Sequence, residues 1–258
     1  MARLIAQAYS FPKDPAASQE WEDAAACSVR SGRFAVADGA TESFRSGEWA
    51  ELLVRAYITS FPPSATPTFR DEGRVDPARQ RVIQEWFGSQ VRRWREHASE
   101  AQTWWGRDAE ASQPPSATFA GLQFTGDAAA GLNWESSAFG DCCLFQIRGR
   151  RLALSFPLTS KDQFTKRPDL ITTAPGRVEG SLATLRTRTG RAIPGDIFVL
   201  ASDAFSACLL SLSESEPTLW GRIGFFGGRQ FAELMMELRK ADAIEVDDVA
   251  MVVVAVCP

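Results

Sequence analysis

Residues 247–256 read Asp-Asp-Val-Ala-Met-Val-Val-Val-Ala-Val, and this stretch decides the class of the fold. The eight residues after the two aspartates are all apolar and rich in β-branched valine, which is typical of a strand covered on both faces. Such a strand requires a further layer of structure on each side of its sheet. The stretch therefore predicts a layered fold with strands at its centre.

Other parts of the chain indicate the remaining layers. Short apolar runs predict further strands at residues 33–37, 117–124, 134–139, 142–147, 151–156 and 197–201. Apolar residues spaced three and four apart predict helices within residues 49–57, 82–94 and 231–238. Residues 157–195 are rich in Pro, Gly and Thr and show little periodicity. No repeat or linker divides the chain, so we expect a single α+β domain over residues 1–258.

The composition excludes several classes of protein. The 258 residues include 28 Lys and Arg against 32 Asp and Glu, and a net charge of −4 argues against a dedicated nucleic-acid binder. No run reaches the roughly 18 apolar residues that a membrane helix needs. The five cysteines are odd in number and stand mostly among apolar neighbours, as reduced core thiols do. We therefore expect a cytoplasmic monomer without a membrane or nucleic-acid partner.

Histidine and cysteine offer little for catalysis. His97 is the single histidine, so the chain has no multi-histidine zinc site, and any catalytic triad would need that residue. It stands near the end of the second predicted helix among charged residues, which indicates a surface position. Cys142 and Cys143 are adjacent and would face opposite sides of a strand, which makes them a poor metal or disulfide pair. Trp104 and Trp105 are interpreted as a small core under a loop rather than as a recognition surface. Any chemistry should therefore use carboxylates.

Acidic residues stand at the ends of apolar strands, where burial of an unpaired carboxylate is costly. They are Glu22, Asp23, Asp38, Asp141, Asp203, Asp247 and Asp248. Each one alone is an ordinary turn or cap residue. If the strands pair into one sheet system, however, these ends converge, and the carboxylates would repel one another without a cation. Mg²⁺ and Mn²⁺ prefer such oxygen ligands, and Gly39 after Asp38 would allow a close approach of the backbone.

The order of these motifs resembles a known family. The motifs are Glu22-Asp23-Ala24, Phe34-Ala35-Val36-Ala37-Asp38-Gly39, Ser116-Ala117-Thr118, Gly140-Asp141, Phe198-Val199-Leu200-Ala201-Ser202-Asp203 and Asp247-Asp248-Val249. In this order, over nearly the whole chain, they resemble the metal-dependent Ser/Thr protein phosphatases of the PPM (type 2C) family, in particular its shorter bacterial members. The resemblance implies a four-layer α-β-β-α sandwich of two antiparallel sheets flanked by helices.

The resemblance also implies a centre of two Mn²⁺ or Mg²⁺ ions, with a possible third. By position, Asp38 would bridge two ions and the Gly39 carbonyl would bind one of them. Either Glu22 or Asp23 would join the set, and its remaining members would be Asp203 and Asp247. Asp38, Asp203 and Asp247 would thus be the catalytic residues. Asp141 matches a weaker additional metal site, and Asp248 stands where the family often has Asn, which indicates a supporting role behind the ligands.

The implied activity is hydrolysis of phosphoserine or phosphothreonine on proteins that a Ser/Thr kinase has phosphorylated. A water that bridges two cations becomes hydroxide near neutral pH and attacks phosphorus in line, so no histidine is needed. Two alternatives stay open. One is a non-catalytic relative that binds metal or a partner, and the other is a hydrolase of small phosphorylated compounds.

Three departures from the family concern the substrate site. No His follows Asp38-Gly39 as a general acid, no Arg stands in residues 18–21 to hold phosphate, and Ala204 replaces a Gly. Substitutes for the missing Arg are left open and include Arg30, Arg33 and Arg45. Residues 155–180 stand where the family carries a variable flap, whose basic residues are candidates for meeting a phosphorylated partner. They are Lys161, Lys166, Arg167 and Arg177.

Overall fold

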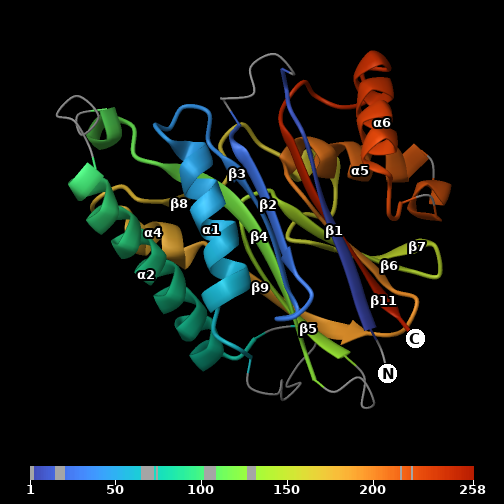
Figure 1. The fold of residues 1–258 in the computed structure, drawn as a ribbon, viewed down its shortest axis with the longest axis horizontal. Coiled ribbons are helices and arrows are strands. Elements are labelled where there is room, and N and C mark those ends of the chain that lie inside the picture. Colours follow the sequence, from blue (N-terminus) through green and yellow to red (C-terminus); the bar gives the residue numbers. More distant parts are fainter. Residues whose placement is uncertain are drawn as a thin grey trace.

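Two antiparallel β-sheets lie face to face in the computed structural model, which describes residues 3–14, 21–64, 73, 75–101, 109–126, 132–215, 217–221 and 223–258 (Figure 1). The first sheet has the strand order β1 (Arg3–Phe11), β11 (Val249–Cys257), β10 (Ile197–Ala201), β6 (Cys143–Arg148) and β7 (Arg151–Phe156). The second has the order β2 (Asp23–Ser28), β3 (Arg33–Gly39), β4 (Ser116–Thr125), β5 (Leu132–Phe139) and β9 (Arg186–Ala192), with β8 (Ile171–Thr172) beside β4.

Strand β11 shows why the molecule has layers. Val252, Val254 and Val256 point between the sheets and pack with apolar residues of β3 and β4. Met251 and Val253 point to the opposite face and pack with the helices. Both faces of the strand are therefore buried, as the continuous apolar run at residues 249–256 predicts.

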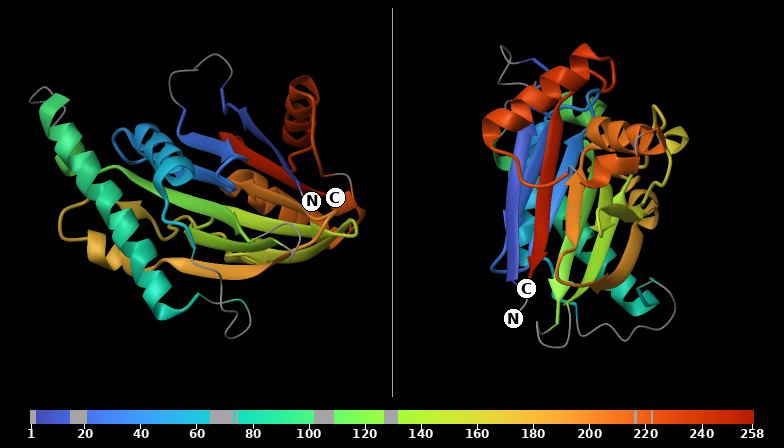
Figure 2. Two further views of the ribbon diagram at one scale, coloured as in Figure 1. Left: turned by 60° about the horizontal axis from the view of Figure 1, so that its bottom comes forward. Right: turned by 90° about the vertical axis from the view of Figure 1, so that its right-hand side faces the viewer.

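Helices cover both outer faces of the sandwich (Figure 2). Helices α1 (Ser46–Ser60) and α2 (Pro77–Ala101) pack on the second sheet, and α4 (Val178–Ala183) lies against α2. Helices α5 (Asp203–Ser215) and α6 (Gly228–Lys240) cover the first sheet, together with the short 3₁₀ helix η2 (Pro217–Gly221). Another 3₁₀ helix, η1 (Lys161–Gln163), lies beside α5. The predicted four-layer α-β-β-α sandwich is confirmed.

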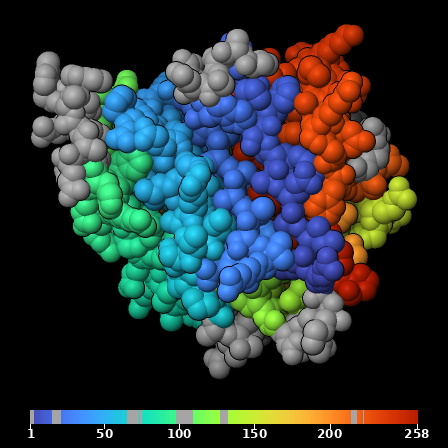
Figure 3. All heavy atoms as spheres, viewed as in Figure 1, coloured from blue at the N-terminus to red at the C-terminus, as the bar shows by residue number. Residues whose placement is uncertain are grey.

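The two sheets meet along a seam formed by their edge strands β1 and β2. Figure 3 shows this seam, where residues of β1 and β2 (blue) reach the surface between α1 (cyan) and α6 (orange-red). The chain termini lie close together on adjacent strands, with Arg3 opposite Cys257.

Several elements are not predicted from the sequence. The longest of them are strand β1, strand β9 within the aperiodic residues 157–195, and helix α5. Helix α5 contains several serines, which interrupt the apolar spacing from which a helix is predicted. The hydroxyl group of one of them, Ser206, donates a hydrogen bond to the Ala201 carbonyl oxygen (3.0 Å). The strands before and after Gly140-Asp141 belong to different sheets, so Asp141 lies in a crossover and not in a hairpin.

The prediction for the adjacent cysteines is confirmed. Cys142 packs between the two sheets, whereas Cys143 packs on the helix-covered face of the first sheet. All five cysteines are free thiols.

Candidate functional site

Strand ends bring four acidic side chains to one end of the sandwich. Asp23 on β2 is the register partner of Asp38 on β3, and their carboxyl groups share a hydrogen bond. Asp203 follows β10 directly, where Ser202 ties this strand to β11 by accepting a hydrogen bond from the Ala250 amide (3.0 Å). The convergence predicted from acidic residues at strand ends is therefore present for Asp23, Asp38 and Asp203, with Asp141 beside them.

Burial and mutual repulsion raise the pKa values of these four carboxyl groups. Burial is the main cause that raises the pKa of Asp38 well above its usual range, and Asp23, Asp203 and Asp141 raise it further. Burial and the charge of Asp203 raise the pKa of Asp23 to about 8 and that of Asp141 to about 7. The pKa of Asp203 is raised to about 6, by burial and then by Asp247.

Two oxygen atoms of this group are left without a partner. Asp23 Oδ2 and Asp141 Oδ1 are buried and accept no hydrogen bond. None of the four carboxyl groups forms an ion pair with a described Lys or Arg. Buried oxygens of this kind normally have a proton donor, a water or an ion beside them.

A divalent cation fits these side chains by its chemistry. It would replace the retained protons, remove the repulsion and satisfy the orphaned oxygens. Within the described ranges, however, no three His, Cys, Asp or Glu side chains are already gathered into a metal-binding group. Of the predicted ligands, Asp23, Asp38, Asp141 and Asp203 thus lie near one another, but they do not form a preassembled metal-binding group.

Glu22 and Asp23 lie in different surroundings. The Asp23 carboxyl group faces Asp38, whereas the Glu22 carboxylate accepts hydrogen bonds from Lys13 Nζ (3.2 Å) and Thr41 Oγ1 (3.0 Å). The ion pair with Lys13 gives Glu22 a cationic partner that Asp23 lacks. Both residues remain candidates, but a cation beside Glu22 would have to displace the Lys13 ammonium group.

Asp248 supports the backbone around the site. Its side chain is buried, and its two oxygens accept hydrogen bonds from the amides of Lys13 (2.7 Å) and Glu22 (3.0 Å). Arg239 on α6 donates to the Asp247 carbonyl oxygen (2.6 Å) and to the carbonyl oxygens of Pro12 and Lys13. Sequence reasoning missed Lys13 and Arg239, because some of their partners lie 235 and 227 residues away and neither residue belongs to a recognised motif.

Gly39 is required for a reason that the sequence does not show. A Cβ atom at this position would lie 2.6 Å from the Ser46 carbonyl carbon and 2.9 Å from the Glu22 carbonyl oxygen. The glycine therefore lets the start of α1 and the end of β2 pack directly on β3. Its amide donates to the Glu22 carbonyl oxygen (3.0 Å), which ties the end of β3 to the residue before β2.

An open cleft of about 950 Å³ lies over this acidic end. Asp38, Gly39, Asp203 and Asp247 line it, together with residues 40–43 and 112–114. Residues of the segment 166–177 also line it, and we term this part its basic wall because it carries three basic side chains. They are Lys166, Arg167 and Arg177.

The remaining basic candidates lie elsewhere. Arg30 is in the turn between β2 and β3, and Arg33 begins β3, so both are at the far end of the strand that ends in Asp38. Arg45 pairs with Glu48 and stacks on Trp94. None of the three lines the cleft.

Two other expectations concern residues outside the cleft. His97 is exposed on α2 and donates from Nδ1 to the Arg93 carbonyl oxygen (2.8 Å), which confirms the predicted surface position. Trp104, Trp105 and residues 18–20 lie outside the described residues. No helix within the described ranges is long and apolar enough to cross a membrane.

Comparison with known proteins identifies the fold. No family model and no curated sequence matches the chain. Among solved structures, PppA, described as a key regulatory component of T6SS in Pseudomonas aeruginosa, is 18% identical with a TM-score of 0.63, covering 99% of this chain and 100% of that one. The serine/threonine phosphatase PstP/Ppp of Mycobacterium tuberculosis is 15% identical with a TM-score of 0.65, covering 99% of both chains. A PstP catalytic domain in complex with two manganese ions is 16% identical with a TM-score of 0.62, over the full length of both.

Proposed function

We propose that this chain is a metal-dependent phosphatase that hydrolyses phosphoserine and phosphothreonine on proteins. Its fold is that of the PPM Ser/Thr phosphatases, over the full length of the chain. We further propose that residues 1–258 form one phosphatase domain, which acts in the cytoplasm as a monomer on proteins phosphorylated by a Ser/Thr kinase.

One observation carries the proposal. Four carboxyl groups from different elements lie close together without a cationic side chain among the described residues. Asp141 is buried, the other three are half-buried, and two of their oxygens are buried without a partner. A protein that needed them only for stability would pair them, because an unpaired buried carboxylate is destabilising. The arrangement is explained if the carboxylates bind cations in the active protein, because the cations would offset the repulsion among them.

In the proposed site, two Mn²⁺ or Mg²⁺ ions would be held by Asp38, Asp203, Asp247, the Gly39 carbonyl and either Asp23 or Glu22. Asp141 would contribute to an additional, weaker site. Ions held there would supply a nucleophile at neutral pH and stabilise charge on the phosphoryl oxygens.

The residues behind the ligands keep them in place. Asp248 accepts a hydrogen bond from the amide of Glu22, and Arg239 donates one to the carbonyl of Asp247, so the backbone at both residues is held by part-buried hydrogen bonds. Residues that orient metal ligands in this way raise metal affinity by about 10- to 100-fold.

The basic wall of the cleft supplies the substrate contact. Lys166, Arg167 and Arg177 line the same cavity as Asp38 and Asp203, which makes them the candidates for the missing phosphate-binding Arg. The cleft is open and wide enough to accept a phosphorylated side chain that projects from a protein surface. Residues 155–180 would thus act as a flap that meets the phosphorylated partner.

A second candidate is a non-catalytic regulatory relative. The described residues hold no preassembled metal-binding group, residues 18–21 contain no Arg, and one protein of the same fold is described as a regulatory component. In that case the acidic end would bind metal or a partner without turnover.

Turnover of an aryl phosphate separates these possibilities. Full-length protein is assayed with p-nitrophenyl phosphate in EDTA and in Mn²⁺, beside Asp203→Asn and the exposed control Asp76→Asn. The proposal expects Mn²⁺-dependent turnover that Asp203→Asn abolishes and Asp76→Asn retains. A folded protein that shows no Mn²⁺-dependent turnover would instead be the non-catalytic relative.

The substrate class needs a separate comparison. Phosphoserine and phosphothreonine peptides are assayed against a panel of small phosphorylated metabolites. Higher kcat/KM on the peptides supports the protein phosphatase, and higher kcat/KM on a metabolite supports the small-molecule alternative. Deletion within residues 155–180 should change the preference among peptides, and an unchanged preference would remove the proposed role of the flap.

A further inference from the structure

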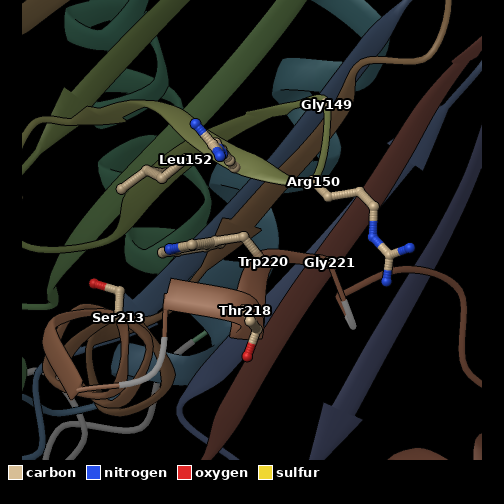
Figure 4. A pocket seen from close by; sticks show the side chains of 8 residues that line it. Gly149, Arg150, Leu152, Ser213, Thr218, Trp220 and Gly221 are labelled. Carbon is tan, nitrogen blue, oxygen red and sulfur yellow. The ribbon is translucent and has the colours of Figure 1, made fainter.

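A second cavity lies apart from the acidic cleft and shares no lining residue with it. It has a volume of about 670 Å³ and is formed by the turn between β6 and β7, the end of α5, and η2 (Figure 4). Its lining residues are Gly149, Arg150, Arg151, Leu152, Ser213, Thr218, Trp220 and Gly221. A cavity of this size accommodates a large side chain together with part of its backbone.

The floor of this cavity is apolar and rigid. Trp220 is only 3% exposed, and its ring lies 5.4 Å from the ring of Phe145 in the core. Leu152 packs against the same core from β7. Both side chains are held by the core behind them, so the cavity does not need to form when a ligand arrives.

The turn beside the cavity places an arginine in an unfavourable backbone conformation. Gly149 and Arg150 are the two residues between β6 and β7, and both have positive φ, at 56° and 64°. Hairpin turns of this kind favour Gly, Asn or Asp at both positions, because a side chain with a Cβ is strained there. A residue kept against this preference points to a function of its side chain.

The Arg150 side chain lies over Gly221 at the rim of the cavity (Figure 4). A Cβ atom on Gly221 would stand 2.7 Å from Arg150 Nε, so the glycine leaves room for the arginine to lie across η2. The backbone of the turn at Arg150 and the backbone of η2 at Gly221 are therefore both shaped to accommodate the Arg150 side chain.

Two neighbouring arginines at this rim have no acidic partner. Arg150 and Arg151 are exposed, and neither forms an ion pair with a described residue. Arg148 in the same hairpin behaves differently, because its guanidinium group pairs with Asp196 at 2.7 Å. The hairpin thus has one arginine that stabilises the fold and two that are available to a ligand.

We propose that this cavity is a docking site for an acidic segment of a partner protein that carries one large apolar side chain. The apolar side chain would pack on Trp220 and Leu152, and flanking carboxylates would pair with Arg150 and Arg151. The site would tether its partner without blocking the acidic cleft. It rests on none of the metal chemistry proposed above.

Peptide binding tests this site directly. Fluorescein-labelled Asp-Glu-Asp-Trp-Asp-Glu-Asp is titrated with the full-length protein and followed by anisotropy, beside the same peptide with Gly at its centre and a Lys-for-acid counterpart. We expect the acidic Trp peptide to bind most tightly, with an affinity that falls as salt rises. Arg150→Gly and Arg151→Gln should each weaken binding at least about fivefold, as the loss of one charge-assisted contact predicts.

The substitution at the turn separates binding from folding. Arg150→Gly removes the cation but suits the backbone conformation, so the Tm should stay unchanged or rise while peptide affinity falls. Arg229→Gln, at an exposed arginine on α6, is the matched control and should leave binding intact. Equal binding by wild type and both variants, no preference for the acidic Trp peptide, or no binding at millimolar protein would each overturn the proposal.

Discussion

Buried carboxylates occur in two kinds of surroundings in this molecule. Glu135 on β5 is 1% exposed and is held by Arg79 through contacts of 2.8 Å and 3.0 Å. Asp196, also 1% exposed, accepts hydrogen bonds from Arg148, from Gln146 and from the Ile193 amide. Both carboxylates are fully partnered, as expected for charges that serve the fold.

The acidic end of the sandwich is the opposite case. Asp23, Asp38, Asp141 and Asp203 have no cationic side chain beside them, and two of their oxygens have no partner. The same chain that pairs Glu135 and Asp196 so completely leaves these four unpaired. This difference is the basis of our proposal that the four carboxyl groups bind a ligand from outside the chain.

The largest expected effect is on turnover. Asp38→Asn should lower Mn²⁺-dependent kcat by at least about a hundredfold, because it removes the carboxylate between the two proposed ions. The Tm of the metal-free variant should stay level or rise, since the substitution relieves repulsion within the group. Activity assays and differential scanning fluorimetry of the same preparation measure both, and full turnover by the variant would refute the assignment of Asp38.

Substitution of Glu135, whose carboxylate is paired with Arg79, should lower stability without affecting Mn²⁺ binding. Glu135→Ala leaves the largely buried Arg79 charge without its anionic partner, with only the Pro62 and Pro63 carbonyls to accept its hydrogen bonds. The free energy of unfolding should therefore fall by about 3–5 kcal/mol. Urea denaturation measures this loss. Mn²⁺ binding by the folded fraction should not change, and a loss of Mn²⁺ affinity equal to that of Asp38→Asn would remove the distinction between the two regions.

The two regions should also differ in their pH dependence. The folded-state pKa values of Asp203, Asp141 and Asp23 are raised to about 6, 7 and 8, whereas the unfolded chain releases these protons near the ordinary value of 3.8. The folded protein therefore holds more protons between those values, and its stability should fall as pH rises from about 4 to 8. With one pKa unit worth about 1.4 kcal/mol, the Tm in EDTA should drop by several degrees.

Mn²⁺ should reverse this trend, because it binds the deprotonated carboxylates. The gain in Tm on adding Mn²⁺ should be larger at pH 8 than at pH 5.5. If the Tm of the metal-free protein stays flat or rises between pH 5 and 8, the raised pKa values of these groups are contradicted. Asp23→Asn should make the Tm less dependent on pH near pH 8.

The smallest effect concerns the substrate wall of the cleft. Arg177→Gln should raise KM for a phosphopeptide by about five- to tenfold, the loss expected from one charge-assisted contact, with Mn²⁺ affinity unchanged. Arg229→Gln serves as the control at a distant, exposed arginine. If Arg177→Gln leaves KM unaltered, Lys166 or Arg167 must hold the phosphate instead.

Much of this arrangement follows from the sequence. The apolar run at residues 249–256 implies a strand buried on both faces, and acidic residues at strand ends imply that Asp23, Asp38 and Asp203 meet. These inferences succeed because strand alternation and chain direction are local properties. The opposite faces of Cys142 and Cys143 follow in the same way.

Other parts depend on contacts that no local pattern encodes. The ion pair of Lys13 with Glu22 joins the end of β1 in one sheet to the start of β2 in the other. The hydrogen bond from Arg239 to the Asp247 carbonyl forms only when α6 packs on the first sheet. The need for glycine at position 39 comes from the packing of α1 on β3, not from a property of its own strand. The basic residues of the cleft belong to an aperiodic segment whose course the sequence does not predict.

Calorimetric titration of Mn²⁺ into the metal-free protein at pH 8 tests the central contrast most directly. Two ions should bind to the wild type, with release of protons from the acidic end. At least one ion should be lost in Asp203→Asn, whereas Asp76→Asn should bind as the wild type does. Absence of Mn²⁺ binding by the folded wild-type protein, or equal binding by Asp203→Asn, would contradict the view that the unpaired carboxyl groups are arranged for cations.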